Sequence, residues 1–267
     1  MSLPKNVSSL SIHEGPKSAG TREMISVHNL VKKFGDVTAV ADISFCVPEG
    51  QIFAFLGPNG AGKTTTIKIL TTMLRCTEGS VRIDGLDVAV SQDKVRRCFG
   101  IVFQDSSLDD AMSAYENLSF HAVLYGLKGQ RRYARIEEVL RRFDLWERRD
   151  EKVSKYSTGM RRRLEIARSL LHTPRILFLD EPSAGLDPQT RSYLWKQVKA
   201  LNENEGVTVF LTTHYLEEAE RVADYIAIID HGKIVAQGTA SNLKELTEMT
   251  TLDDAFVVLT GSSIRDG

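Results

Sequence analysis

A glycine-rich segment that ends in Gly-Lys-Thr follows a short apolar run in this 267-residue chain. Its spacing, G-x-x-x-x-G-K-T, lets successive backbone N–H groups face one anion. The lysine adds a point charge, and the first threonine offers a hydroxyl to Mg²⁺. Residues 65–74 have the pattern of a helix, which would aim its positive end at the same anion. This strand–loop–helix order favours a phosphate-binding loop over a plain glycine-rich turn. The predicted loop comprises Gly57, Pro58, Asn59, Gly60, Ala61, Gly62, Lys63, Thr64 and Thr65.

Two acidic residues follow a second apolar run, Ile176–Leu179, which has the length of a buried strand. If this strand lies beside that of the loop, its acids reach the bound phosphates. Asp180 would hold Mg²⁺ directly or through water. Neighbouring strand side chains diverge, so Glu181 would be free to polarise an attacking water. A strand that merely ends in an acidic turn is the alternative, and the phosphate loop weakens it.

The elements that must position these residues follow from hydrophobic patterning. Short alternating apolar patches from Met24 to Val47 predict an antiparallel N-terminal β subdomain. Residues 113–168 change to a helical period and predict an inserted helical lobe. Continuous apolar runs predict parallel strands covered on both faces: Ile52–Leu56, Ile176–Leu179 and Val207–Leu211. Residues 100–103 are also strand-like, and residues 225–229 are a further candidate strand. The predicted fold class is α/β, a P-loop NTPase core with a mostly parallel sheet.

Composition narrows the classes of function. The net charge of −1 gives no general reason to bind nucleic acid. Arginines of the helical stretch alternate with acids, which is typical of a solvated helix surface. The cysteines Cys46, Cys76 and Cys98 lack C-x-x-C spacing and are interpreted as small buried residues in a reducing compartment, not as a disulfide or zinc framework. No stretch approaches the ~20 apolar residues that cross a bilayer as a helix.

The chain is divided into three parts by these patterns. Residues 1–22 lack a secretory apolar core and any period, and are expected to form a disordered tail. Residues 23–240 are expected to form the two-lobed core, with the helical lobe at about 105–170. Residues 241–267 are expected to form a C-terminal helical extension.

From about residue 24 to residue 261 the chain resembles the ATP-binding cassette (ABC) ATPases. The segment Tyr156-Ser157-Thr158-Gly159-Met160, followed by three arginines, occupies the place of the family's LSGGQ signature. Thr158 and Met160 depart from that pattern. Ser157 and Gly159 match it, and the resemblance implies that they meet a γ-phosphate at a helix N-terminus. A plain Ser/Thr helix cap is the alternative.

The resemblance implies further roles. Gln104 matches the Q-loop glutamine, near Mg²⁺ and at the joint with the helical lobe, and His214 matches the switch histidine that contacts the γ-phosphate. Asp187 lies in the matching D-loop. Phe34 occupies the position of the aromatic that stacks on adenine, although a hydrophobic turn anchor is its alternative. ATP and Mg²⁺ are the implied cofactors, and two copies would sandwich two ATP molecules.

The resemblance also implies a partner and a location. The interval from Gln104 to Ser157 leaves room for a compact lobe but not for a long coiled-coil arm. The C-terminal segment 252–261 resembles the ending of exporter ATPases for drugs, lipid-linked sugars or nodulation signals. We therefore expect the ATPase subunit of an exporter, peripheral on the cytoplasmic side of the inner membrane, bound to a separate polytopic membrane subunit. A soluble ABC ATPase acting on nucleic acid or a protein complex, and a P-loop kinase, are the alternatives.

Overall fold

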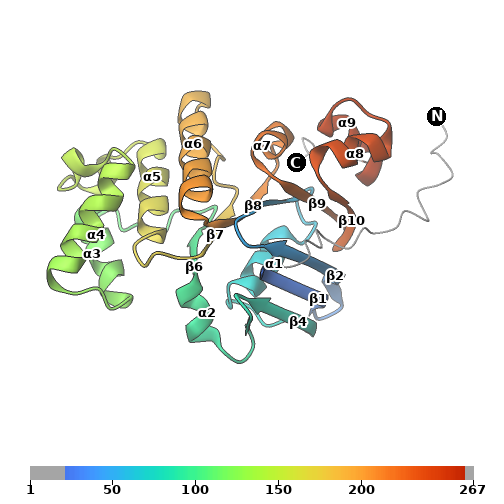
Figure 1. The fold of residues 1–267 in the computed structure, drawn as a ribbon, viewed down its shortest axis with the longest axis horizontal. Coiled ribbons are helices and arrows are strands. Elements are labelled where there is room, and N and C mark those ends of the chain that lie inside the picture. The colour runs from blue at the N-terminus through green and yellow to red at the C-terminus, as the bar shows by residue number, and fades with distance from the viewer. Residues whose placement is uncertain (1–21, 262–267) are drawn as a thin grey trace.

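The computed structural model describes residues 22–261, so the expected N-terminal tail, apart from Arg22, lies outside the described residues. Within that range the strands form one six-stranded and one four-stranded sheet. Figure 1 shows α3, α4 and α5 at one end of the molecule and α8 and α9 at the other. No helix in the described range combines the length and apolar character needed to cross a membrane.

The six-stranded sheet forms the centre of the α/β core, with the order β10-β9-β3-β8-β7-β6. Neighbouring strands run parallel except for β10, which pairs antiparallel with β9 at one edge. This arrangement confirms the predicted fold class. The bounds are β3 Ile52–Leu56, β6 Phe99–Val102, β7 Ile176–Asp180, β8 Thr208–Thr213, β9 Tyr225–Asp230 and β10 Lys233–Gly238.

The central strand β3 is buried on both faces, as its unbroken apolar sequence predicts. Phe53 and Phe55 point into a cluster shared with the antiparallel sheet and α1 (Lys63–Leu70). Ala54 and Leu56 point into a second cluster with two helices on the opposite face. Those helices are α6 Pro188–Glu205 and α7 Leu216–Val222. The strand is therefore fixed from both sides, and the loop that follows it starts from a rigid base.

The antiparallel sheet has the order β2-β1-β4-β5 and contains the predicted N-terminal hairpin. Its strands β4 and β5, and the following helix α2, had no counterpart in the sequence prediction. The β9–β10 turn connects β2 with the phosphate loop. The Ala41 N–H of β2 donates to the Gly232 carbonyl of the turn (2.7 Å), and the Gly232 N–H donates to the Ala61 carbonyl of the loop (3.0 Å). The bounds are β1 Glu23–Phe34, β2 Val37–Pro48, β4 Glu78–Ile83, β5 Leu86–Asp87 and α2 Gln92–Cys98.

The helical lobe contains α3, α4 and α5, as the change of period predicts. Ser113 caps α3 through a reciprocal box: its side chain accepts from the Glu116 N–H, and the Glu116 carboxylate accepts from the Ser113 N–H. The α5 helix packs toward β6 and links the lobe to the sheet. The bounds are α3 Ala114–Leu124, α4 Gly129–Arg142 and α5 Thr158–Ser169, with 3₁₀ turns at Trp146–Arg148 and Val153–Lys155.

The C-terminal part contains α8 (Ala240–Thr247) and α9 (Leu252–Thr260), which pack on each other and on β10 and α7. Leu252 and Phe256 of α9 are fully buried. Two expectations need correction. The helix predicted over residues 65–74 is α1, which begins at Lys63 and ends at Leu70, because Thr72 has a left-handed backbone (φ 63°). The three cysteines are half-buried, not fully buried.

Candidate active site

Every loop that follows a parallel strand opens at the same edge of the six-stranded sheet. The register aligns Leu56 of β3 with Thr213 of β8, and Asp180 of β7 with Thr212 of β8. Residues 57–65, Glu181 and His214 therefore leave the sheet side by side. Ligands of open α/β sheets bind at this carboxyl edge.

Two glycines of the predicted phosphate loop, Gly57 and Gly62, have no room for a side chain. A Cβ on Gly57 would lie 2.3 Å from the Ile229 carbonyl oxygen, and one on Gly62 would lie 2.6 Å from the Ala39 carbonyl oxygen. Gly62 also has φ 108°, a conformation that other residues rarely adopt. It is the N-cap of α1 and offers that helix no side-chain cap. The first α1 amides are thus left to meet an anion.

Lys63 is buried at the start of α1, where its Nζ donates to the carbonyls of Gly57 (2.7 Å) and Pro58 (3.0 Å). Burial lowers the pKa of this ammonium, and the carboxylates of Glu181 and Asp180 oppose that shift. The lysine is therefore hydrogen-bonded to the same loop in which it is predicted to bind a phosphate. It also faces both acidic residues predicted from the end of β7.

Asp180 is buried at the end of β7, and the Thr212 hydroxyl of β8 donates to its Oδ1 at 2.6 Å. Burial raises the pKa of this carboxyl, while the hydrogen bond from Thr212 lowers it. A nearby cation would stabilise the charged form. Thr64 places an exposed hydroxyl at the start of α1. Hydroxyl and carboxylate oxygens are ligands that suit Mg²⁺, so these residues fit the predicted metal role.

Glu181 and His214 form the closest contact among the predicted catalytic residues: Glu181 Oε2 lies 3.2 Å from His214 Nδ1. The Glu181 N–H donates to the Thr212 carbonyl at 3.1 Å. Its backbone has φ 48°, an uncommon value for a non-glycine residue. Glu181 lies one residue beyond the end of β7 and contacts His214, whereas Asp180, the last residue of β7, is bound by the Thr212 hydroxyl. A carboxylate beside an imidazole can orient and polarise a water molecule.

Gln104 follows β6, whose Val102 is in register with Leu179. It is exposed two residues beyond the strand, on the side of the sheet edge where Asp180 and Glu181 lie. Its backbone carbonyl accepts a hydrogen bond from Arg162 of α5 at 3.0 Å. The predicted joint between core and helical lobe is therefore a direct contact. An amide oxygen at this place is compatible with Mg²⁺.

Ser157 is the N-cap of α5, and Gly159 lies in the first turn of that helix. The Ser157 hydroxyl oxygen accepts from the Met160 N–H at 3.3 Å, so the helix-cap alternative describes one role of this side chain. A Cβ on Gly159 would lie 2.6 Å from Thr190 Cγ2 of α6, so the glycine is needed within its own subunit. Asp187 caps α6 and accepts from the Thr190 N–H (2.9 Å) and hydroxyl (2.6 Å). The signature helix and the D-loop are thus packed together.

Phe34 ends β1 at the tip of the N-terminal hairpin. Its ring is 48% exposed, and the Lys32 Nζ lies 4.8 Å from the ring centroid. An anchor of the turn would be covered by its neighbours, whereas this ring is open to a stacking partner.

The family model described as ABC transporter matches residues 40–184 of the chain. The daunorubicin/doxorubicin resistance ATP-binding protein DrrA of Streptomyces peucetius is 45% identical over 220 residues, which cover 82% of this chain and 66% of that protein. The linearmycin resistance ATP-binding protein LnrL of Bacillus subtilis is 40% identical over 220 residues, 82% of this chain and 70% of that protein. The chain thus spans about two thirds of the length of these relatives.

Solved structures agree with this match. An ATP-binding subunit of an ABC transporter has a TM-score of 0.80 at 29% identity, over 88% of this chain and 99% of that chain. A dimeric ATP-binding cassette in a post-hydrolysis state, bound to ADP and Pi, has a TM-score of 0.74 at 28% identity, over 81% and 98%. The fold and the site define a P-loop NTPase. The family match is more specific: the chain belongs to the ABC transporter family and contains an ATPase domain of that family.

Several side chains around the site were missed by sequence reasoning. Thr212 orients Asp180, and Glu218 of α7 accepts from the D-loop Ser183 hydroxyl at 2.6 Å. Arg162 and Glu165 of α5 form a buried ion pair, with 3.0 Å between Nη1 and Oε2. The sequence did contain a signal for that ion pair. Arg162 and Glu165 have opposite charges and lie three residues apart on a helix rich in buried residues. Contacts of Thr212 and Glu218 join distant segments and have no such local signal.

Proposed function

We propose that this chain is the ATP-hydrolysing subunit of an ABC exporter, converting ATP and water to ADP and phosphate. The observation that carries the catalytic part is the Glu181–His214 contact at the sheet edge that also presents Lys63 and Asp180. The relatives named for daunorubicin, doxorubicin and linearmycin resistance support an export role. Like them, the chain is an ATP-binding protein of a family whose members act in transport.

The proposed roles combine the positions of the residues with the roles that the family resemblance implies. The amides of Gly60, Gly62 and Lys63 and the Lys63 ammonium bind the β- and γ-phosphates, and Phe34 stacks on the base. Thr64, Asp180 and Gln104 hold Mg²⁺, which when bound neutralises charge on the phosphates. Glu181 polarises the attacking water, and His214 holds the Glu181 carboxylate and contacts the γ-phosphate.

The proposed assembly has two ATPase subunits and a separate polytopic membrane subunit, on the cytoplasmic side of the cell membrane. Ser157 and Gly159 lie at the start of α5 in the helical lobe, whereas the phosphate loop lies between β3 and α1 of the core (Figure 1), and this arrangement supports their action on the nucleotide of the second subunit. The dimeric form of the structural neighbour gives independent support. Co-purification with a polytopic membrane protein tests the assembly against a soluble ABC ATPase.

The catalytic assignment is tested by Glu181→Gln. The amide preserves the shape of the side chain but cannot act as a base, so turnover should fall by about 10²–10⁴-fold. Affinity for ATP and Mg²⁺ should stay at the parental value. Asp180→Asn should instead raise the Mg²⁺ concentration that half-maximal activity requires. Steady-state ATPase assays measure turnover and its Mg²⁺ dependence, and binding of a fluorescent ATP analogue measures affinity. Parental turnover in Glu181→Gln would exclude Glu181 as the base.

A further inference from the structure

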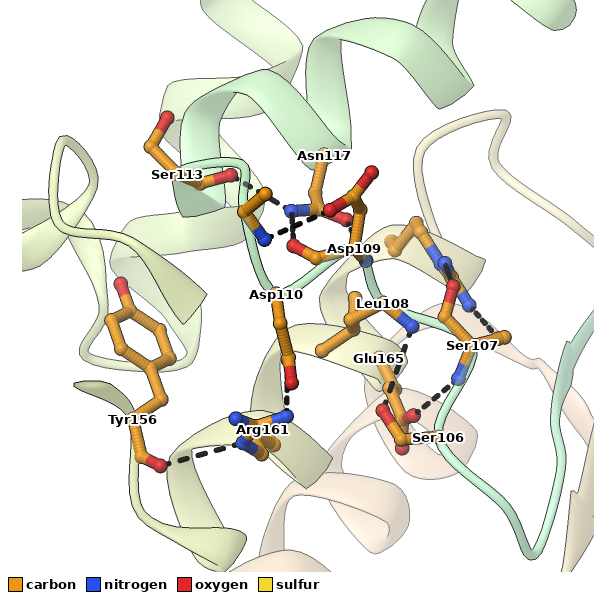
Figure 2. A network of polar contacts seen from close by, with 12 residues as sticks. Ser106, Ser107, Leu108, Asp109, Asp110, Ser113, Asn117, Tyr156, Arg161 and Glu165 are labelled. Atoms are coloured by element: carbon orange, nitrogen blue, oxygen red, sulfur yellow. Dashed lines mark hydrogen bonds and ion pairs between the residues drawn. The ribbon is translucent and has the colours of Figure 1, made fainter. Parts of the chain in front are cut away.

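Three charged side chains of α5 reach across to the segment that follows β6. They are Arg162, Glu165 and Arg168, spaced so that they share one side of the helix. Their partners are the backbone and side-chain atoms of residues 103–107. Figure 2 shows part of this contact, with Glu165 directed at Ser107 below the turn that leads to Asp109 and Asp110.

Arg162 makes the central contacts of this group. Its Nη1 donates to the Phe103 carbonyl at 2.6 Å, and its Nη2 donates to the Gln104 carbonyl at 3.0 Å. Both carbonyls lie beyond the end of β6, whose register with β7 ends at Val102 and Leu179. A planar guanidinium can hold two acceptors in a fixed relation, which an ammonium cannot do. The backbone of Gln104 is thus held by an arginine from the helical lobe.

Glu165 keeps this arginine in place. Its Oε2 accepts from Arg162 Nη1 at 3.0 Å, and its Oε1 accepts from the Ser107 N–H at 3.2 Å. Arg162 is 8% exposed and Glu165 is 3% exposed. A buried ion pair is weak evidence for stability, because desolvation opposes the charge attraction. The contacts of this ion pair with residues 103–107 indicate that it holds that backbone segment in place.

The orientation of Gln104 depends on that segment. Its side chain is exposed, so packing does not fix it, and its direction follows from the backbone that Arg162 holds. Arg168 adds a second attachment, since its Nη1 donates to the Ser107 carbonyl at 2.7 Å. Residues 103–107 are therefore attached to α5 at both ends.

We propose that Arg162 is a positioning residue for Gln104, and that Glu165 holds Arg162 in the orientation that this requires. The inference rests on the proposed function, in which the Gln104 amide contributes to Mg²⁺ binding. Loss of the two carbonyl contacts frees the Gln104 backbone and misplaces its amide. The expected defect is in turnover and Mg²⁺ dependence, not in the affinity for metal-free ATP.

The test replaces the buried pair without leaving an unpaired charge. Arg162→Met combined with Glu165→Met supplies apolar side chains of similar length, an exchange that often preserves stability. Arg162→Lys keeps a cation beside Glu165 but loses the fork to two carbonyls. Each is made in the parental chain and in Gln104→Ala. The control, Arg141→Met with Glu137→Met, removes an exposed ion pair (2.8 Å) from α4 of the same lobe.

We expect the buried double variant to fold, to lower kcat by about 10-fold or more, and to raise the half-saturating Mg²⁺ concentration. In the Gln104→Ala background the same change should alter kcat by less than about two-fold, because both substitutions act through one side chain. Arg162→Lys should show the same pattern with a smaller loss, and the α4 control should match the parent.

Parental kcat and Mg²⁺ dependence in the folded double variant would overturn the inference. Equal fold-losses with and without Gln104 would also overturn it, because they would show a general structural role. If the double variant does not fold, Arg162→Lys in the same two backgrounds decides by the same criteria. A parental chain that hydrolyses no ATP, alone or with its membrane subunit, would instead contradict the proposed function.

Discussion

Lys63 is the buried cation of the phosphate loop. Its ammonium donates to two carbonyls of the loop, and burial lowers its pKa. Substitution with alanine removes both the bonds to the loop and the cation nearest to the phosphates. We expect Lys63→Ala to weaken ATP binding by about 1.5–3 kcal/mol, the range for a hydrogen bond to a charged group.

Titration with a fluorescent ATP analogue measures this loss of affinity. Lys196→Ala is the control, because that lysine is exposed on α6 away from the loop. Equal affinity in Lys63→Ala and in the control would show that the lysine does not contact the nucleotide.

At the level of residues, the sequence predicted those that belong to contiguous motifs and missed those that support them. The phosphate loop, Asp180 and Glu181 could be identified because neighbouring positions carry the chemistry. Thr212 could not, because its contact with Asp180 depends on the pairing of β7 with β8. Arg162 was interpreted only as part of a basic run, since nothing local shows that its partners are backbone carbonyls.

The contact between α5 and α6 gives a prediction at the level of elements. Gly159→Ala should destabilise the fold, because its methyl group would lie 2.6 Å from Thr190 Cγ2. Overpacking costs about 1–3 kcal/mol. Alanine in a helix gains only about 0.5–1 kcal/mol over glycine, so the net effect should be a loss.

A second substitution distinguishes this clash from loss of backbone freedom. Thr190→Ser removes Cγ2 but keeps the hydroxyl that donates to Asp187. In that background Gly159→Ala should be far less destabilising in a urea titration. An equal loss of stability in both backgrounds would mean that the methyl group is not in conflict with Thr190.

Element prediction succeeded where burial imposes a uniform pattern. The strands β3, β6, β7, β8 and β9 lie within two residues of the predicted runs, because both faces of the sheet are covered. The prediction missed β4 and β10, which are largely exposed or half-buried and so lack a continuous apolar run. It also extended α1 too far, since apolar residues continue beyond the point where Thr72 turns the backbone.

Dimerisation is the prediction that belongs to the whole molecule. Ser157 sits at the exposed N-terminus of α5, so a second subunit can approach it. A Glu181→Gln chain, which should retain ATP, is expected to dimerise when Mg-ATP is added. Light scattering measures the mass with and without nucleotide, and Ser157→Arg in the same background should prevent the change. A monomer at saturating ATP, both alone and in the assembled complex, would contradict the proposed sandwich.

The order of strands in the central sheet also constrains how the chain is made. The phosphate-loop strand β3 lies near the N-terminus, yet both of its neighbours, β8 and β9, are near the C-terminus. Domains emerge from the ribosome at about 5–20 residues per second, so β3 must wait with both edges unpaired while most of the chain is synthesised. Pairing over such sequence distances is slow. The apolar strand that precedes the phosphate loop therefore stays without its sheet neighbours until residues 208–230 have been made.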